Sequence, residues 1–138
     1  MRTALKIMLV AAFALSSPAQ DRFESGKLKG FTKSPTEHII AEIDDAFEVR
    51  SVQGTIVFKG KDDELKGVVF EIRGPGGLER IRAARTDSNG RFKIRRVPEG
   101  TYTFKATLDG FQSVVGTLVV SKKADRQETI KIEMPIGV

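Results

Sequence analysis

The side chains that carry out most catalytic chemistry are scarce in this sequence. Its 138 residues include no Cys, no Trp, one His (His38) and one Tyr (Tyr102). This inventory excludes thiol nucleophiles, disulfide bonds, zinc sites built from Cys and His, and every site that needs two histidines. We therefore expect a protein that is not an enzyme and that binds no metal and no cofactor.

One oxygen-rich stretch, 87–90, has the composition of the start of a calcium-binding loop. It reads Asp-Ser-Asn-Gly, but the distant bidentate Glu and the further ligands of such a loop are missing. Asn followed by Gly supplies the positive φ angles that a tight turn requires. We interpret Asp87, Asn89 and Gly90 as turn residues, and we assign no role to His38, a single imidazole among acidic residues.

The strongest signal for binding is a basic segment between residues 73 and 96. It contains eight Arg or Lys residues against Glu79 and Asp87, which gives a local charge of +6. If its two strands form a hairpin, four side chains share the outward face: Arg80, Arg82, Lys93 and Arg95. Such a face suits an acidic glycan, a lipid headgroup or an acidic protein surface. The alternative interpretation is a solvated strand face that keeps the protein soluble.

The first 19 residues have the pattern of a cleavable signal peptide. Arg2 and Lys6 precede an apolar run over 7–15, and Ser17 and Ala19 occupy the positions that a signal peptidase reads. The run is too short to span a membrane, which needs about 20 residues, and no Cys follows it to carry a lipid anchor. We expect cleavage after Ala19 and a secreted or periplasmic protein.

The net charge of the exported chain is small. Loss of Arg2 and Lys6 reduces the 23 basic residues to 21, against 18 acidic residues, which leaves a charge of +3. Together with export, this charge argues against a nucleic-acid partner.

The predicted elements begin with a leader and a helix, both within 20–46. Residues 20–33 show no period and predict a flexible segment. Ser34, Pro35 and Glu37 then form the pattern of a helix start, and apolar residues follow at helical spacing, which predicts an amphipathic helix over 35–46. We expect this helix to cover an open edge or flank of a sheet, and docking on a partner protein is the alternative.

From Phe47 onward the hydrophobic period changes from helical to alternating. Seven short strands are predicted, separated by polar turns and by Gly-Pro or Asn-Gly breaks. They lie within 52–58, 68–73, 79–86, 91–97, 102–108, 111–120 and 128–134. Seven strands at nearly regular spacing indicate a single all-β domain over 47–138, a seven-stranded Greek-key β-sandwich preceded by the short helix.

The turn sequences also resemble a known family. The stretches 86–94, 97–104 and 109–111, with the opening 52–57 and the step 65–70, resemble the carboxypeptidase regulatory-like domain over about 52–134. This resemblance implies a transthyretin-like, carbohydrate-binding-like sandwich without chemistry of its own. Gly100 belongs to the second turn, and the Tyr102 hydroxyl is placed to tie a corner to nearby backbone.

These inferences lead to one functional prediction with one alternative. We predict a monomeric, non-catalytic accessory module that binds a protein partner or takes part in assembly, through sheet edges or the basic hairpin face. The alternative is a carbohydrate-binding module, because many starch-binding domains resemble this sandwich. Sugar sites stack rings on exposed aromatic residues, and only Phe23, Phe31 and Phe111 are expected to be exposed.

Overall fold

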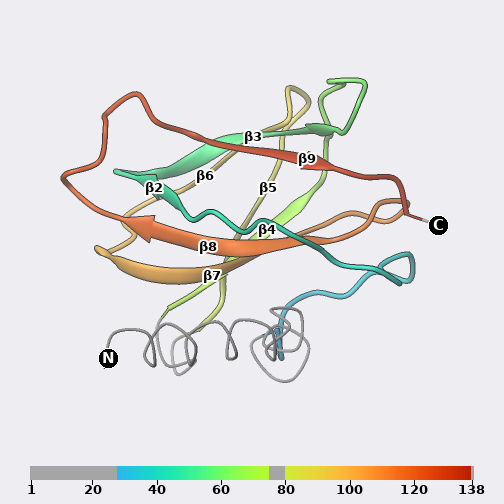
Figure 1. Ribbon diagram of the computed structural model, residues 1–138, viewed down its shortest axis with the longest axis horizontal. Coiled ribbons are helices and arrows are strands. Elements are labelled where there is room, and N and C mark those ends of the chain that lie inside the picture. The colour runs from blue at the N-terminus through green and yellow to red at the C-terminus, as the bar shows by residue number, and fades with distance from the viewer. Residues whose placement is uncertain (1–27, 75–79, 138) are drawn as a thin grey trace, which may run out of the picture.

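The computed structural model describes residues 28–74 and 80–137, which form an all-β sandwich of two sheets (Figure 1). The first sheet has the order β1-β8-β7-β4-β5, with β2 also paired to β8, and the second has the order β6-β3-β9. The strands of the first sheet are β1 (Ala41–Glu42), β2 (Phe47–Val49), β4 (Val69–Arg73), β5 (Arg82–Arg85), β7 (Gly100–Thr107) and β8 (Val114–Val120). Those of the second are β3 (Val52–Phe58), β6 (Arg91–Ile94) and β9 (Ile130–Met134).

The predicted sandwich is confirmed, and the alternation of apolar residues gives its inward faces correctly. Phe70 and Ile72 of β4 and Phe104 and Ala106 of β7 are all buried. Phe70 stacks on Phe92 of the opposite sheet with 4.2 Å between ring centroids, so an aromatic contact joins the two layers. The core therefore lies between the sheets, where period-2 patterning places it.

The helix predicted over 35–46 is wrong. Its first part is a single turn, in which the Ser34 N–H donates to Glu37 Oε1 at 2.9 Å. The chain then joins the exposed edge of β8: the Ala41 N–H donates to the Ser113 carbonyl and the Ile43 N–H to the Val115 carbonyl, both at 2.9 Å. Pairing with an open strand edge satisfies these backbone groups and overrides the local helical pattern.

The part of the predicted leader that the structure describes, 28–33, packs against the sheet. Leu28 and Phe31 are buried against Val115 on the outer face of the first sheet. We call residues 28–43 the strap, because they run over this face and end on β8. The strap covers a flank of the sheet, which is the role that the sequence predicted for the helix over 35–46. The predicted signal peptide, 1–19, lies outside the described residues.

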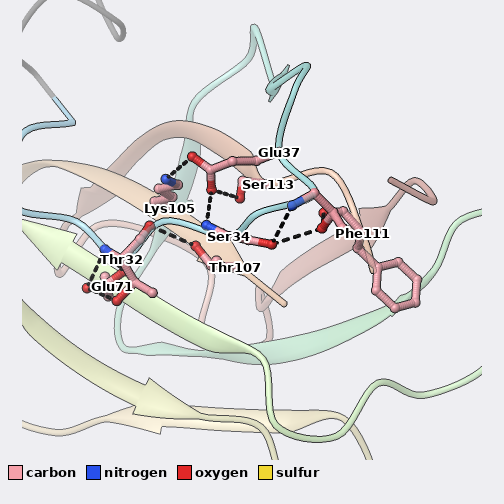
Figure 2. A network of polar contacts seen from close by, with 9 residues as sticks. Thr32, Ser34, Glu37, Glu71, Lys105, Thr107, Phe111 and Ser113 are labelled. Atoms are coloured by element: carbon pink, nitrogen blue, oxygen red, sulfur yellow. Dashed lines mark hydrogen bonds and ion pairs between the residues drawn. The ribbon is translucent and has the colours of Figure 1, made fainter. Parts of the chain in front are cut away.

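Polar side chains attach the strap to the sheet beneath it (Figure 2). Lys105 of β7 is 1% exposed, and its Nζ lies 2.9 Å from Glu37 Oε2 in the strap. The Ser113 hydroxyl donates to Glu37 Oε1 at 2.6 Å. On the neighbouring strand, the Glu71 carboxylate accepts hydrogen bonds from the N–H and the hydroxyl of Thr32. A buried cation in the sheet is therefore neutralised by a residue of the strap.

Candidate interaction surface at the β5–β6 edge

The candidate surface lies where the edge strands of the two sheets meet. β5 is the outer strand of the first sheet and β6 the outer strand of the second. A turn over 87–90 joins them, in which Asp87 Oδ1 accepts the N–H groups of Asn89 at 2.8 Å and Arg91 at 3.0 Å. These hydrogen bonds, chiefly the one from the Arg91 N–H, hold the pKa of Asp87 below its usual value.

Glycine is required at the end of this turn. Gly90 has a φ of 72°, and a Cβ there would lie 2.8 Å from the Ile56 carbonyl oxygen. Asn89 is not among the positive-φ residues, so Gly90 alone supplies the left-handed conformation that the sequence suggested for the pair.

The predicted hairpin of the basic segment is wrong, because β5 and β6 belong to different sheets. Thr86 keeps β5 on β4: its N–H donates to the Val68 carbonyl at 3.0 Å, and its hydroxyl accepts the Val68 N–H at 2.8 Å. The chain then crosses the sandwich, and β6 pairs with β3. A local turn sequence cannot distinguish these outcomes, since the strand partners lie far away in the chain.

The four predicted cations consequently do not share one face. Arg82 lies opposite Ile72 in the β4–β5 register, so it is on the core side of the first sheet. Its guanidinium reaches across the open edge and donates to the carbonyls of Arg95 at 2.5 Å and Arg96 at 3.0 Å. Arg80 and Arg82 line a small pocket beside Tyr102. Lys93 and Arg95 line another, on the second sheet.

A larger groove of about 590 Å³ lies over the edge itself. Three exposed cations line it, Arg85 from β5 and Arg91 and Lys93 from β6, together with Asp87. Its remaining polar lining comes from Gln53, Thr55 and Thr129. We call this feature the basic groove. Sequence reasoning missed it because Arg85 and Arg91 lie on strands of different sheets, and only the crossing at 87–90 places both beside one groove.

The corner expected at Tyr102 is held by a side-chain hydrogen bond to the backbone. The Tyr102 hydroxyl donates to the Pro98 carbonyl at 2.6 Å, which fastens the start of β7 to the preceding turn. Pro98, Glu99 and Tyr102 also line the pocket that contains Arg80 and Arg82.

Replacing Tyr102 with Phe removes this hydroxyl and keeps the ring. Because the residue is half-buried, we expect the free energy of unfolding to fall by about 1 kcal/mol. Urea denaturation followed by circular dichroism measures it. An unchanged midpoint would show that the bond contributes nothing to the corner.

Sequence reasoning also missed the buried polar residues beneath the strap. Lys105 lies directly opposite Glu71 in the β4–β7 register, at positions that face away from the core. Such positions predict solvated charges, yet Lys105 and Glu71 are 1% and 5% exposed because the strap covers them. No local pattern indicates this cover, so burial here follows from tertiary structure alone.

Exposed aromatic rings are absent from residues 28–74 and 80–137. Phe31, expected to be exposed, is 4% exposed, and Phe111 is half-buried with its ring 5.2 Å from that of Phe58. Phe23 lies outside the described residues. The only large apolar side chains exposed in this part of the chain are Ile39 and Ile136. The described surface thus has no ring platform for stacking a sugar.

The described residues also lack the usual groupings of a reactive centre. No three His, Cys, Asp or Glu side chains among them are placed to hold a metal ion. His38 is exposed on the strap. This same part of the chain contains no helix that is long and apolar enough to cross a membrane.

Comparison with known proteins gives one family. The carboxypeptidase regulatory-like domain matches residues 51–134, from the start of β3 to the end of β9, and leaves the strap outside. No curated protein matches this chain.

Two similar solved structures contain interface mutants of a type II cohesin–X-dockerin complex from Acetivibrio cellulolyticus. For the C-terminal interface mutant, identity is 24% and the TM-score 0.41, over 61% of this chain and 56% of that chain. For the N-terminal interface mutant, identity is 26% and the TM-score 0.41, over 63% and 58%. This chain therefore spans less than two thirds of either matched chain.

Proposed function

This chain belongs to the carboxypeptidase regulatory-like domain family, and we propose that it is an exported, non-catalytic module that binds an acidic protein partner through the basic groove. The family match and the sandwich support a binding module of this kind. The signal-like pattern of residues 1–19 supports export.

The observation that carries the proposal is the charge of the basic groove. Arg85, Arg91 and Lys93 are exposed, and none of them has an ion-pair partner among the described residues. Asp87 contributes the one negative charge, and its Oδ1 is occupied by backbone N–H groups of the turn. Three exposed cations that line one shallow groove beside a single acidic residue attract a complementary acidic surface and speed its association.

The groove suits a protein better than a neutral sugar. Its polar lining can donate hydrogen bonds, but no exposed aromatic ring lies in the described surface to stack a sugar ring. Arginine side chains bind carboxylates in a planar, two-point geometry, which favours Asp and Glu side chains of a partner. Binding to a neutral carbohydrate is the alternative outcome of the test, and it would favour a carbohydrate-binding module.

Neutralising the groove tests the proposal. We expect the triple variant Arg85→Ser/Arg91→Ser/Lys93→Ser to bind polyglutamate at least about tenfold more weakly than the unmodified protein at low salt. Its fold should persist, because these three side chains are exposed and make no hydrogen bond within the described residues. Surface plasmon resonance on immobilised polyglutamate measures the change.

A matched control removes the same charge elsewhere. The variant Lys59→Ser/Lys66→Ser/Lys123→Ser changes three exposed lysines that do not line the groove. It should bind polyglutamate within about twofold of the unmodified protein, since distant charges are screened by salt. Equal losses of binding in both triple variants would mean that binding depends on the total charge and not on the groove. That result would contradict the proposal.

A further inference from the structure

A second feature that could bind a partner is the free edge of β9. β9 is the outer strand of the second sheet, with β3 on one side and no strand on the other within the described residues. An edge strand exposes N–H and C=O groups that can pair with another strand.

The backbone groups on this edge can be assigned from those that face β3. The Met134 carbonyl accepts the Lys59 N–H at 3.0 Å, so Met134 faces β3, as does Ile130, whose carbonyl lies against Gly54. Peptide groups alternate in direction along a strand. Lys131 and Glu133 therefore direct their N–H and C=O groups to the free side.

The other edge of the same sheet is partly covered. On β6, the Arg91 carbonyl accepts the Asp87 N–H at 2.9 Å, and the Arg91 N–H donates to Asp87 Oδ1 at 3.0 Å. The Arg95 carbonyl is bound by Arg82. These contacts occupy the outward backbone groups of Arg91 and the Arg95 carbonyl, and Lys93 between them keeps its outward N–H and C=O groups. No comparable contact covers Lys131 or Glu133 among the described residues.

The charges on β9 are self-complementary. Lys131 and Glu133 are exposed, lie on the same face, and have no ion-pair partner in the described part of the chain. If two copies of β9 pair antiparallel about a twofold axis at Ile132, Lys131 of each copy lies opposite Glu133 of the other. Both pairs then exchange backbone hydrogen bonds and join opposite charges.

We propose that two copies of this chain associate through β9, in this register, to form a weak dimer. The Pro135 carbonyl already accepts the Gln112 N–H at 2.9 Å, and Pro135 has no N–H, so pairing ends there. An interface this short predicts weak, reversible association. This proposed dimer differs from the monomer expected from the sequence, and it does not rest on the basic groove.

Charge reversal on β9 tests this register. In Lys131→Glu both cross-strand pairs become acidic, and in Glu133→Lys both become basic. We expect each variant to dimerise at least about tenfold more weakly than the unmodified protein. An equimolar mixture of the two variants restores opposite charges at both pairs and should form heterodimers. Sedimentation velocity across a concentration series measures all of these states.

Controls and a second readout keep the result specific. Lys66→Glu and Asp63→Lys change exposed charges away from β9 and should leave dimerisation unchanged. Amide hydrogen exchange should show Lys131 and Glu133 protected at high concentration only, with Ile132 protected throughout. A protein that stays monomeric up to its solubility limit would overturn the proposal, as would a dimer that neither single reversal weakens.

Discussion

Replacing Glu37 with Gln is expected to lower the free energy of unfolding by about 3 kcal/mol, because it leaves the buried ammonium of Lys105 without its counter-charge. The substitution keeps the hydrogen bonds that the other carboxylate oxygen, Oε1, accepts. The amide oxygen of the new side chain can still accept the Ser34 N–H and the Ser113 hydroxyl, as Glu37 Oε1 does. The loss therefore reports on the ion pair itself, and urea denaturation measures it.

The control for this result removes both charges. In Glu37→Gln/Lys105→Met, an apolar side chain of similar length replaces the buried cation, and most of the lost stability should return. A double variant as unstable as the single one would show that the strap depends on the shape of these residues and not on their charges.

The same residue gives the pH dependence of stability. Burial opposes ionisation of Glu37, but hydrogen bonds from Ser113, Lys105 and the Ser34 N–H, with the charge of Lys105, outweigh it and lower its pKa below 4.5. A carboxyl with a lowered folded pKa contributes stability above its unfolded pKa, and that contribution is lost as the pH falls through the folded value. The unmodified protein and Glu37→Gln should therefore converge in stability below pH 4.5. A difference that does not depend on pH would contradict this account.

Replacing Gly54 with Ala is expected to cost about 3 kcal/mol or more, because β9 passes directly against this position of β3. A Cβ here would lie 1.9 Å from the Ile130 carbonyl oxygen and 2.7 Å from its carbon, both backbone atoms that cannot rotate away. The substitution must therefore push β9 off β3 and disrupt the parallel ladder. Thermal and urea denaturation both report the loss.

Gly60→Ala is the matched control, since Gly60 has a φ of 90° and no atom within 4 Å of an added Cβ. Only the left-handed conformation is penalised there, at about 1 kcal/mol. If Gly54→Ala costs no more than Gly60→Ala, the close approach of β9 does not limit this position.

The inward strand faces could be predicted because their pattern is local. Alternating side chains identify Phe70, Ile72, Phe104 and Ala106 as core residues without knowledge of which strands pair. Gly90 could be assigned to a turn for the same reason, since the demand for positive φ is a property of one residue.

Strand partners could not be predicted, because they depend on distant residues. The capping pattern at Ser34 and Glu37 is real, since its side-chain bond forms, but β8 then pairs with the following residues and prevents a helix. The basic groove was missed in the same way: Thr86 holds β5 on β4, which separates the basic residues onto two sheets. Lys105 was missed because only the strap buries it.

Binding of the unmodified protein to acidic and neutral ligands, at low and high salt, tests the central claim most directly. An array with polyglutamate, heparin and a neutral starch-type glucan covers an acidic polypeptide, an acidic glycan and a neutral sugar. The proposed function predicts that the protein binds polyglutamate most tightly, and that this binding weakens as salt screens the charges of the basic groove. Salt-independent binding to the neutral glucan, with none to polyglutamate, would contradict it.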